Sequence, residues 1–168
     1  MFLAFNVIAV FLIAVAMSLA LAHALELPGK QRLDEQTYRA VQTIYYPGFT
    51  IGGVAEPLAI VVTLILLLTT SRDRGEFWWF LAAFLAVVGM QAIFWLVTQP
   101  ANRFWLKNQQ LSRSGARFFA VDREKQSAEG ETSNQDWRQL RDRWEYSHVA
   151  RAALSGIALI AVVIAIAS

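Results

Sequence analysis

The chain has 168 residues and no cysteine, so it can form neither a disulfide nor a thiolate metal site. Its net charge of +2 gives no reason to expect nucleic acid as a partner. Hydrophobic residues make up 56% of the chain, which is more than in an ordinary soluble domain, and the length suits one domain over residues 1–168.

Four apolar stretches are each long enough to cross a bilayer as a helix of about 20 residues. They cover residues 2–25, 49–70, 77–98 and 149–167. None shows the two-residue alternation of a membrane barrel strand. The pattern predicts an all-α fold, an integral membrane four-helix bundle whose partner is the lipid bilayer, with a charged loop over 101–147.

The first stretch has a competing interpretation. Ala22-His23-Ala24 resembles the cleavage site of a signal peptide. However, no Lys or Arg precedes the apolar run, and the run is longer than the usual apolar region of about 7–15 residues. We therefore expect a membrane-spanning helix here.

The basic residues are distributed unevenly among the loops. Loop one carries Lys30, Arg32 and Arg39, whereas the tight loop two carries only Arg72 and Arg74. Loop three carries most of the remaining basic residues. By the positive-inside rule, loops one and three are cytoplasmic and both termini lie outside.

Loop three is divided by composition. Residues 127–136 are polar and rich in turn formers, so we expect them to be mobile. Residues 102–121 mix basic and aromatic side chains, which suits either the membrane surface or a solvated loop. From Trp137 onward, large side chains recur at steps of three and four, so the fourth helix is predicted to begin before the membrane.

Polar residues gather at the end of the bundle that holds loops one and three. His23, Glu56, Asn102 and His148 come from four different spans. A charged Glu56 inside an apolar run costs about 2.5–3.5 kcal/mol on insertion scales, so it needs a partner. Arg151 could pair with its charge, or either histidine could form a hydrogen bond with it.

The segment around Glu56 is also expected to be irregular. Pro57 loosens the helix, and Gly48, Gly52 and Gly53 allow another backbone to approach closely.

This arrangement allows two interpretations. One is structural: a buried Glu56–Arg151 pair clamps the second and fourth helices. The other is a cavity with acid–base groups, because ionisable residues inside a membrane usually have a function. Glu26 and Glu145 are interpreted as solvated residues at helix ends.

Two chemistries suit such a cavity. Di-iron bundles use Glu-x-x-His motifs, and here the pattern is incomplete, because Glu145-x-x-His148 is matched only by a reversed His23-x-x-Glu26. If a metal is present, its ligands would be His23, Glu56 and His148. Without a metal, a histidine could remove an activated proton while Arg151 stabilises the resulting oxyanion. No cofactor is predicted.

Three blocks of sequence resemble the anthrone oxygenase-like family of small four-helix membrane proteins, most of them of unknown function. The blocks are "LDEQTYRAVQTIYYPGF", "QPANRFW" and "WRQLRDRWEYSHVARAALSGIALIAVV". Trp144, His148 and Arg151 match the family's residues at the start of the fourth span, together with Arg143, and Asn102 matches its Asn after the third.

Characterised relatives are fungal enzymes that oxidise an anthrone to an anthraquinone with O₂ and are thought to need no metal or flavin. The resemblance implies that Trp144 and His148 belong to an active site in which His148 is the base. The sequence departs from these enzymes in its long loop three and its "HALELPGK" segment, so the substrate stays open.

The leading hypothesis is thus a small oxidative enzyme for a hydrophobic or aromatic small molecule. His148 would be the base and Arg151 would stabilise the anion. Glu56 and His23 would set the protonation of the site, while Trp144 and Asn102 would position the substrate. The alternatives are a membrane scaffold or accessory subunit with the Glu56–Arg151 clamp, and a metal-binding bundle. A homo-oligomer is possible, and a transporter would require one.

Overall fold

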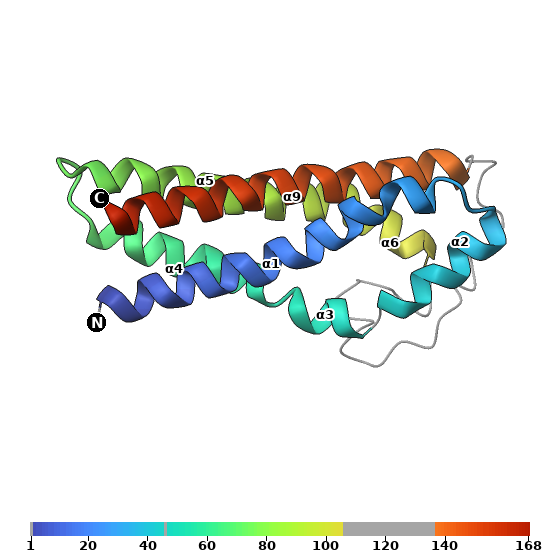
Figure 1. Ribbon diagram of the computed structural model, residues 1–168, viewed down its shortest axis with the longest axis horizontal. Helices are drawn as coiled ribbons and strands as arrows, with labels where there is room; N and C mark the ends of the chain where they lie inside the picture. Colours follow the sequence, from blue (N-terminus) through green and yellow to red (C-terminus); the bar gives the residue numbers. More distant parts are fainter. Residues whose placement is uncertain (1, 46, 106–136) are drawn as a thin grey trace.

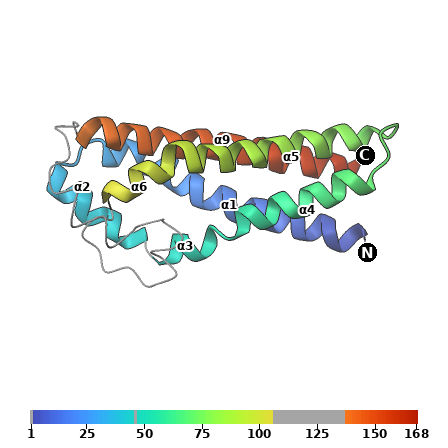
Figure 2. The same ribbon diagram turned by 180° about the vertical axis from the view of Figure 1, so that it is seen from behind.

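Four long helices lie side by side in the computed structural model, which describes residues 2–45, 47–105 and 137–168 (Figure 1). They are α1 (Phe2–Lys30), α4 (Ala55–Thr69), α5 (Gly75–Ile93) and α9 (Trp137–Ala167). Helix α9 packs against α1 and α5, and α4 packs against the same two helices. The two termini and the α4–α5 turn lie at one end of the bundle, and α2 and the start of α9 lie at the other (Figures 1 and 2).

The apolar helices confirm an all-α, multi-pass integral membrane protein. Candidate spans cover Phe2–Lys30, Gly48–Thr69, Gly75–Asn102 and Trp137–Ala167. The first helix thus continues past residue 25, where we expected the span to end. The fourth begins at Trp137, as the spacing predicts. Both edges of the expected loop over 101–147 are helical, since α6 (Gln99–Trp105) precedes the undescribed segment and α9 follows it.

Small residues bring the helices together, and large ones face outward. The central core contains Ala9, Ala59, Ala83, Ala158 and Ala161, all of them buried. Small side chains let helices approach closely in a membrane, where packing rather than water exclusion holds helices together. Outward-facing side chains such as Leu3, Leu68 and Ile160 are largely exposed in the isolated chain, which suits contact with lipid.

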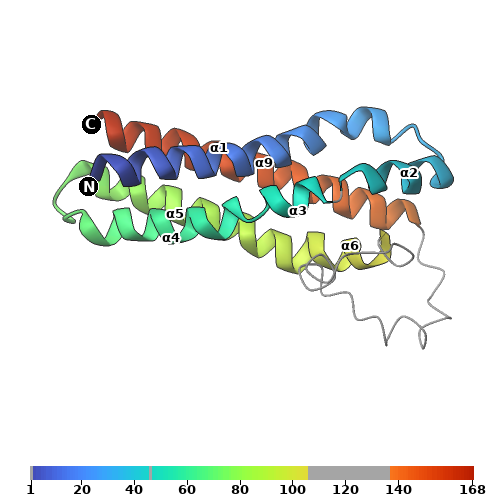
Figure 3. The same cartoon turned by 90° about the horizontal axis from the view of Figure 1, so that it is seen from below.

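The second span is broken just before Glu56. A short helix α3 (Gly48–Gly52) is followed by Gly53 and Val54, and only then does α4 begin (Figure 3). We expected another backbone to approach the glycines of this segment closely, but at Gly48 and Gly52 no backbone does so. A Cβ on Gly52 would lie 2.7 Å from the Leu19 side chain of α1, and a Cβ on Gly48 would meet nothing within 4 Å.

The third span contains a π-helical segment. Residues Phe94–Thr98 (η2) separate α5 from α6, and π turns within helices are often found at functional sites. Pro100 has no N–H to donate to the carbonyl of Leu96. The Arg143 guanidinium donates to that carbonyl instead, over 3.3 Å.

Loop one folds over the end of the bundle. It forms α2 (Glu35–Gln42) and a 3₁₀ turn, η1 (Thr43–Tyr45). The Asp34 carboxylate caps α2 by accepting the Thr37 N–H over 2.8 Å. Tyr38 of α2 is fully buried in a small cluster with Trp144. The predictions for residues 127–136 and for most of 102–121 lie outside the described residues.

Candidate functional site

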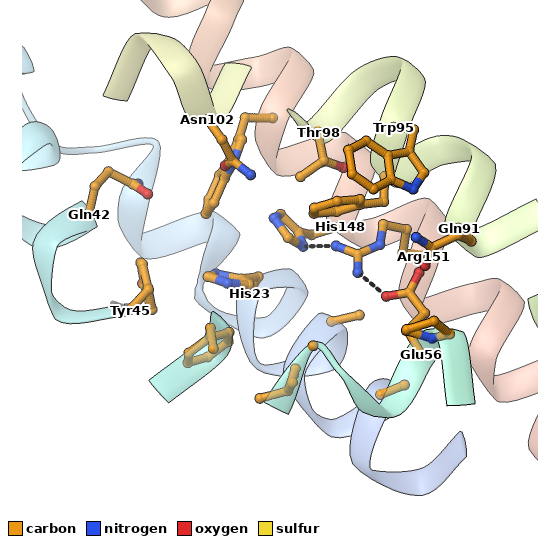
Figure 4. A pocket seen from close by; sticks show the side chains of 18 residues that line it. His23, Gln42, Tyr45, Glu56, Gln91, Trp95, Thr98, Asn102, His148 and Arg151 are labelled. Carbon is orange, nitrogen blue, oxygen red and sulfur yellow. Dashed lines mark hydrogen bonds and ion pairs between the residues drawn. The ribbon is translucent and has the colours of Figure 1, made fainter. Parts of the chain in front are cut away.

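A cavity of about 400 Å³ lies within the loop-one half of the bundle. All six residues that the sequence analysis proposed for a site line it, namely His23, Glu56, Asn102, Trp144, His148 and Arg151 (Figure 4). They come from α1, α4, α6 and α9. Most other lining residues are apolar or aromatic, among them Leu19, Phe49, Phe94 and Trp95.

Arg151 is the central charge of the cavity. Its Nη2 donates to Glu56 Oε2 over 2.6 Å, and its Nη1 lies 3.2 Å from His148 Nδ1 (Figure 4). Arg151 is thus the partner of Glu56, as one of the candidates named from the sequence. In the orientation that satisfies both of its groups, the Gln91 amide donates to Glu56 Oε1 over 3.0 Å and accepts from Trp95 Nε1 over 2.7 Å. Both carboxylate oxygens are therefore engaged.

His148 lines the cavity and carries the proton of its neutral ring on Nε2. A guanidinium can only donate, so His148 Nδ1 accepts from Arg151, and the proton of the neutral ring is on Nε2. His148 Nε2 is buried and has no hydrogen-bond partner among the described residues. An N–H group in this position can donate to a bound ligand. The role of base predicted for His148 would need the opposite tautomer.

The two histidines lie against each other. Their ring centroids are 4.2 Å apart, with His23 coming from α1 and His148 from α9. His23 is further enclosed by the rings of Tyr45, Phe49 and Trp144, at 4.4, 4.7 and 4.8 Å. This aromatic enclosure suits a flat, apolar ligand better than a hydrated ion.

Trp144 and Asn102 are fixed to one another. The Trp144 indole N–H donates to Asn102 Oδ1 over 2.7 Å, and the Asn102 amide donates to Gln99 Oε1 over 3.3 Å. This link between α9 and α6 holds the tryptophan ring at the cavity wall. This contact has the same positioning role under the structural and the catalytic interpretation of the site.

A second buried cluster of charges adjoins the cavity. Lys30 Nζ lies 3.1 Å from His23 Nδ1, 2.9 Å from Glu26 Oε2 and 3.5 Å from Glu145 Oε1. The Tyr38 hydroxyl also donates to Glu145, over 2.9 Å. The interpretation of Glu145 as a solvated residue is therefore wrong, because its side chain is fully buried. Glu26 is 44% exposed, as a residue at a solvated helix end would be.

This cluster perturbs the tyrosines of loop one. Burial raises the pKa of Tyr38, and the neighbouring Glu145 raises it further. Burial also raises the pKa of Tyr45, whose hydroxyl donates to Glu26 over 2.5 Å. Both tyrosines therefore remain neutral donors over the ordinary pH range.

Sequence reasoning missed Lys30, Tyr38 and Gln91. Lys30 was interpreted only as a loop-one charge for the orientation of the protein. Its spacing of four residues from Glu26 and seven from His23 could have placed all three on one helix face, had the helix been expected to continue. Nothing local marks Tyr38, because its partner lies in α9.

The residues of the metal alternative lie around one cavity, yet Arg151 contacts both Glu56 and His148. Within the part of the chain that the structure describes, no group of three or more His, Cys, Asp or Glu side chains could hold a metal ion. A metal site of His23, Glu56 and His148 stays a prediction.

Comparison with known proteins gives one clear relationship. Neither curated proteins nor solved structures give a significant match. The family model for anthrone oxygenase matches residues 42–161, which is most of the chain and includes every cavity residue described above except those of α1. The chain therefore belongs to the anthrone oxygenase family.

Proposed function

We propose that the protein is a small membrane oxidase or oxygenase that acts on a hydrophobic, aromatic substrate held in the cavity. The observation that carries this proposal is the buried Nε2 of His148, which has no partner among the described residues, in a cavity whose walls include five aromatic side chains. Buried polar groups are nearly always hydrogen-bonded, and an exception calls for an explanation. A substrate oxygen that accepts this N–H supplies one.

The chemistry we propose needs only the substrate and O₂. Loss of an activated proton from a CH₂ group that is conjugated with a ketone through aromatic rings, as in anthrone, leaves an extended enolate, whose oxygen is stabilised by the His148 N–H, with the Arg151 charge behind it. The electron-rich anion reduces O₂ and combines with it to give a peroxide. Loss of water then leaves a carbonyl, so that CH₂ and O₂ become C=O and H₂O.

A substrate of this kind can reach the cavity from the bilayer. Two lining residues, Pro57 of α4 and Trp95 of η2, are exposed on the surface of the bundle. The exposed apolar side chains of Leu58 and Leu96 follow them directly in the sequence. We propose that the cavity opens between these two residues toward the lipid, so that a molecule dissolved in the bilayer need not cross water.

The test uses anthrone as the probe and purified protein in mild detergent. We expect O₂ uptake above the uncatalysed rate and quenching of tryptophan fluorescence on binding, because Trp95 and Trp144 line the cavity. His148→Ala should lower O₂ uptake by on the order of 100-fold or more, which is the usual contribution of such a group. Ser155→Ala is the matched control, since Ser155 is a buried polar residue of α9 whose hydroxyl, among the described residues, bonds carbonyls of its own helix.

The main alternative is a scaffold or accessory subunit. It is favoured by the buried Glu56–Arg151 bond, which joins α4 to α9. In that case His148→Ala leaves folding and partner assembly unchanged, whereas Glu56→Ala or Arg151→Ala damages both by instability. Elemental analysis with an absorption spectrum, on wild type and His148→Ala, tests the metal-binding alternative. Stoichiometric metal that disappears in the variant would replace our proposal.

We also propose that loops one and three face the cytoplasm and that both termini lie outside. The support is the excess of basic residues in these loops over the two in loop two. The chain has no cysteine, so single cysteines can be introduced and labelled in intact cells. A membrane-impermeant maleimide should label Ser71→Cys but not Gln36→Cys. The reverse pattern would invert the topology.

A further inference from the structure

We infer that Gln42 is a second ligand-binding residue of the cavity, and that it recognises an oxygen atom other than the one bound by His148. The ligand is then an aromatic ketone that carries a further oxygen acceptor at a separate position on its rings. This inference deepens the proposed function and rests on it for the nature of the ligand.

Three amide side chains line the cavity, and two of them are bonded within the protein. The Gln91 amide donates to Glu56. The Asn102 carbonyl oxygen accepts from the indole of Trp144. Gln42 differs from both, because its side chain is only 5% exposed and its buried Nε2 has no hydrogen-bond partner among the described residues.

The hydroxyl and indole groups of the cavity wall are likewise bonded within the protein. Among the described residues that line the cavity, the buried nitrogens without a partner belong to Gln42, His148 and Arg151. His148 and Arg151 contact each other, so they mark one position in the cavity. Gln42 comes from α2 and marks a second, and in Figure 4 it lies at the opposite end of the labelled side chains from Glu56, with His23 and His148 between them.

The fold holds Gln42 in place before any ligand binds. The buried residues of α2 are Tyr38 and Gln42, which are four positions apart and therefore share one face of the helix. The Tyr38 hydroxyl donates to Glu145 of α9 over 2.9 Å, which fixes this face against the bundle. A donor that is already positioned loses little conformational freedom when it binds a ligand.

A free amide N–H requires an acceptor, such as a carbonyl, ether or phenol oxygen. Leaving such a group buried and unpaired costs free energy, whereas an apolar side chain of the same shape would avoid the cost. Its presence in the wall of a ligand cavity therefore indicates recognition of a ligand oxygen. If water alone satisfies this N–H, a second oxygen on the ligand will not improve binding.

The test compares ligands that differ by one oxygen. Anthrone has one oxygen, whereas anthraquinone and the monomethoxyanthrones each have a second that accepts but does not donate. Binding to the full chain in mild detergent is followed by quenching of tryptophan fluorescence, without O₂ so that anthrone is not consumed. We expect at least one of the ligands with a second oxygen to bind about 2- to 10-fold more tightly than anthrone, as one additional hydrogen bond would produce.

Gln42→Met is the decisive variant, because it keeps a side chain of similar length and removes the N–H. It should abolish the preference for the second oxygen and leave the affinity for anthrone unchanged. Gln36→Met changes an exposed glutamine of the same helix and should keep the preference. The absence of any preference in wild type, or a preference that persists in Gln42→Met, would overturn the inference.

O₂ uptake with anthrone separates this inference from the proposed function. If wild type does not oxidise anthrone but prefers the second oxygen through Gln42, the proposed function fails for this substrate and the second binding position stands. If wild type oxidises anthrone without such a preference, the proposed function stands and the role of Gln42 is wrong. Failure of every probe to quench the fluorescence would overturn both.

Discussion

Replacing Glu56 by Gln should destabilise the bundle far more than the small change in shape suggests. The side chains of Glu56 and Arg151 are only 5% and 10% exposed, and 2.6 Å separates their bonded atoms. Glu56→Gln keeps the volume and one acceptor but leaves the Arg151 charge buried without an anion. Breaking a buried pair by removing one partner costs about 3–5 kcal/mol. We expect about 3 kcal/mol, the lower limit, because the amide oxygen still accepts one bond.

The chain contains a matched control for this experiment. Glu35 and Arg39 of α2 form an ion pair of similar geometry, with 2.8 Å between Arg39 Nη2 and Glu35 Oε1. Their side chains are 45% and 39% exposed, so water screens the pair. Glu35→Gln should therefore cost less than about 1 kcal/mol. The difference between the two variants isolates the effect of burial.

A double variant tests the reason for the loss. Glu56→Gln combined with Arg151→Met removes the unpaired charge as well, and replacing a whole buried pair by apolar groups is often close to neutral. The measurement is reversible unfolding in mixed micelles with increasing denaturing detergent, followed by circular dichroism. The reasoning fails if Glu56→Gln unfolds with the same free energy as Glu35→Gln, or if the double variant is no more stable than the single.

Three smaller changes should have separate effects. Tyr38→Phe removes the hydroxyl that donates to the buried Glu145, and we expect a loss of about 1–3 kcal/mol in the same unfolding assay. Trp144→Phe leaves Asn102 Oδ1 without the indole N–H, and it should weaken anthrone binding as well as lower the unfolding free energy by about 1–3 kcal/mol. The α2 helix should loosen at acid pH, because its capping bond lowers the pKa of Asp34. The cap is fully present above the unfolded-state pKa and is lost as the pH falls through the lower folded-state pKa, so amide exchange in α2 should accelerate there in wild type but not in Asp34→Asn.

The spans could be predicted because each one has a local sequence signal. The central ion pair could be predicted because few partners were available for a charge inside a span. Each span is a continuous apolar run, and only a helix satisfies its backbone in lipid. Glu56 and Arg151 are charges near the ends of two such runs, so each needed a partner and few were available. The break before Glu56 was signalled by its glycines and Pro57, although the neighbour at Gly52 is a side chain and not a backbone.

The second charge cluster could not be read from the sequence in the same way. Tyr38 and Glu145 are bonded across 107 positions of the chain. Their contact depends on loop one folding back over the bundle, and no local pattern encodes that. Lys30 was counted as a charge of loop one because the apolar run was taken to end at residue 25, whereas the helix continues through Pro28 to Lys30. The π-helical segment Phe94–Thr98 was also not predicted from the sequence.

The same contacts serve both the structural and the catalytic interpretation, and His148 Nε2 is where the two interpretations separate. A structural clamp requires only that Glu56 and Arg151 form their ion pair. Its stability would increase with every additional hydrogen bond between the residues that line the cavity. A buried ring N–H without a partner among the described residues costs stability, and a cavity of about 400 Å³ forgoes packing contacts that larger side chains could supply. Native proteins retain such losses mainly at functional sites. The arrangement therefore favours a site that is completed by its ligand, with the ion pair as the support that holds His148 in position.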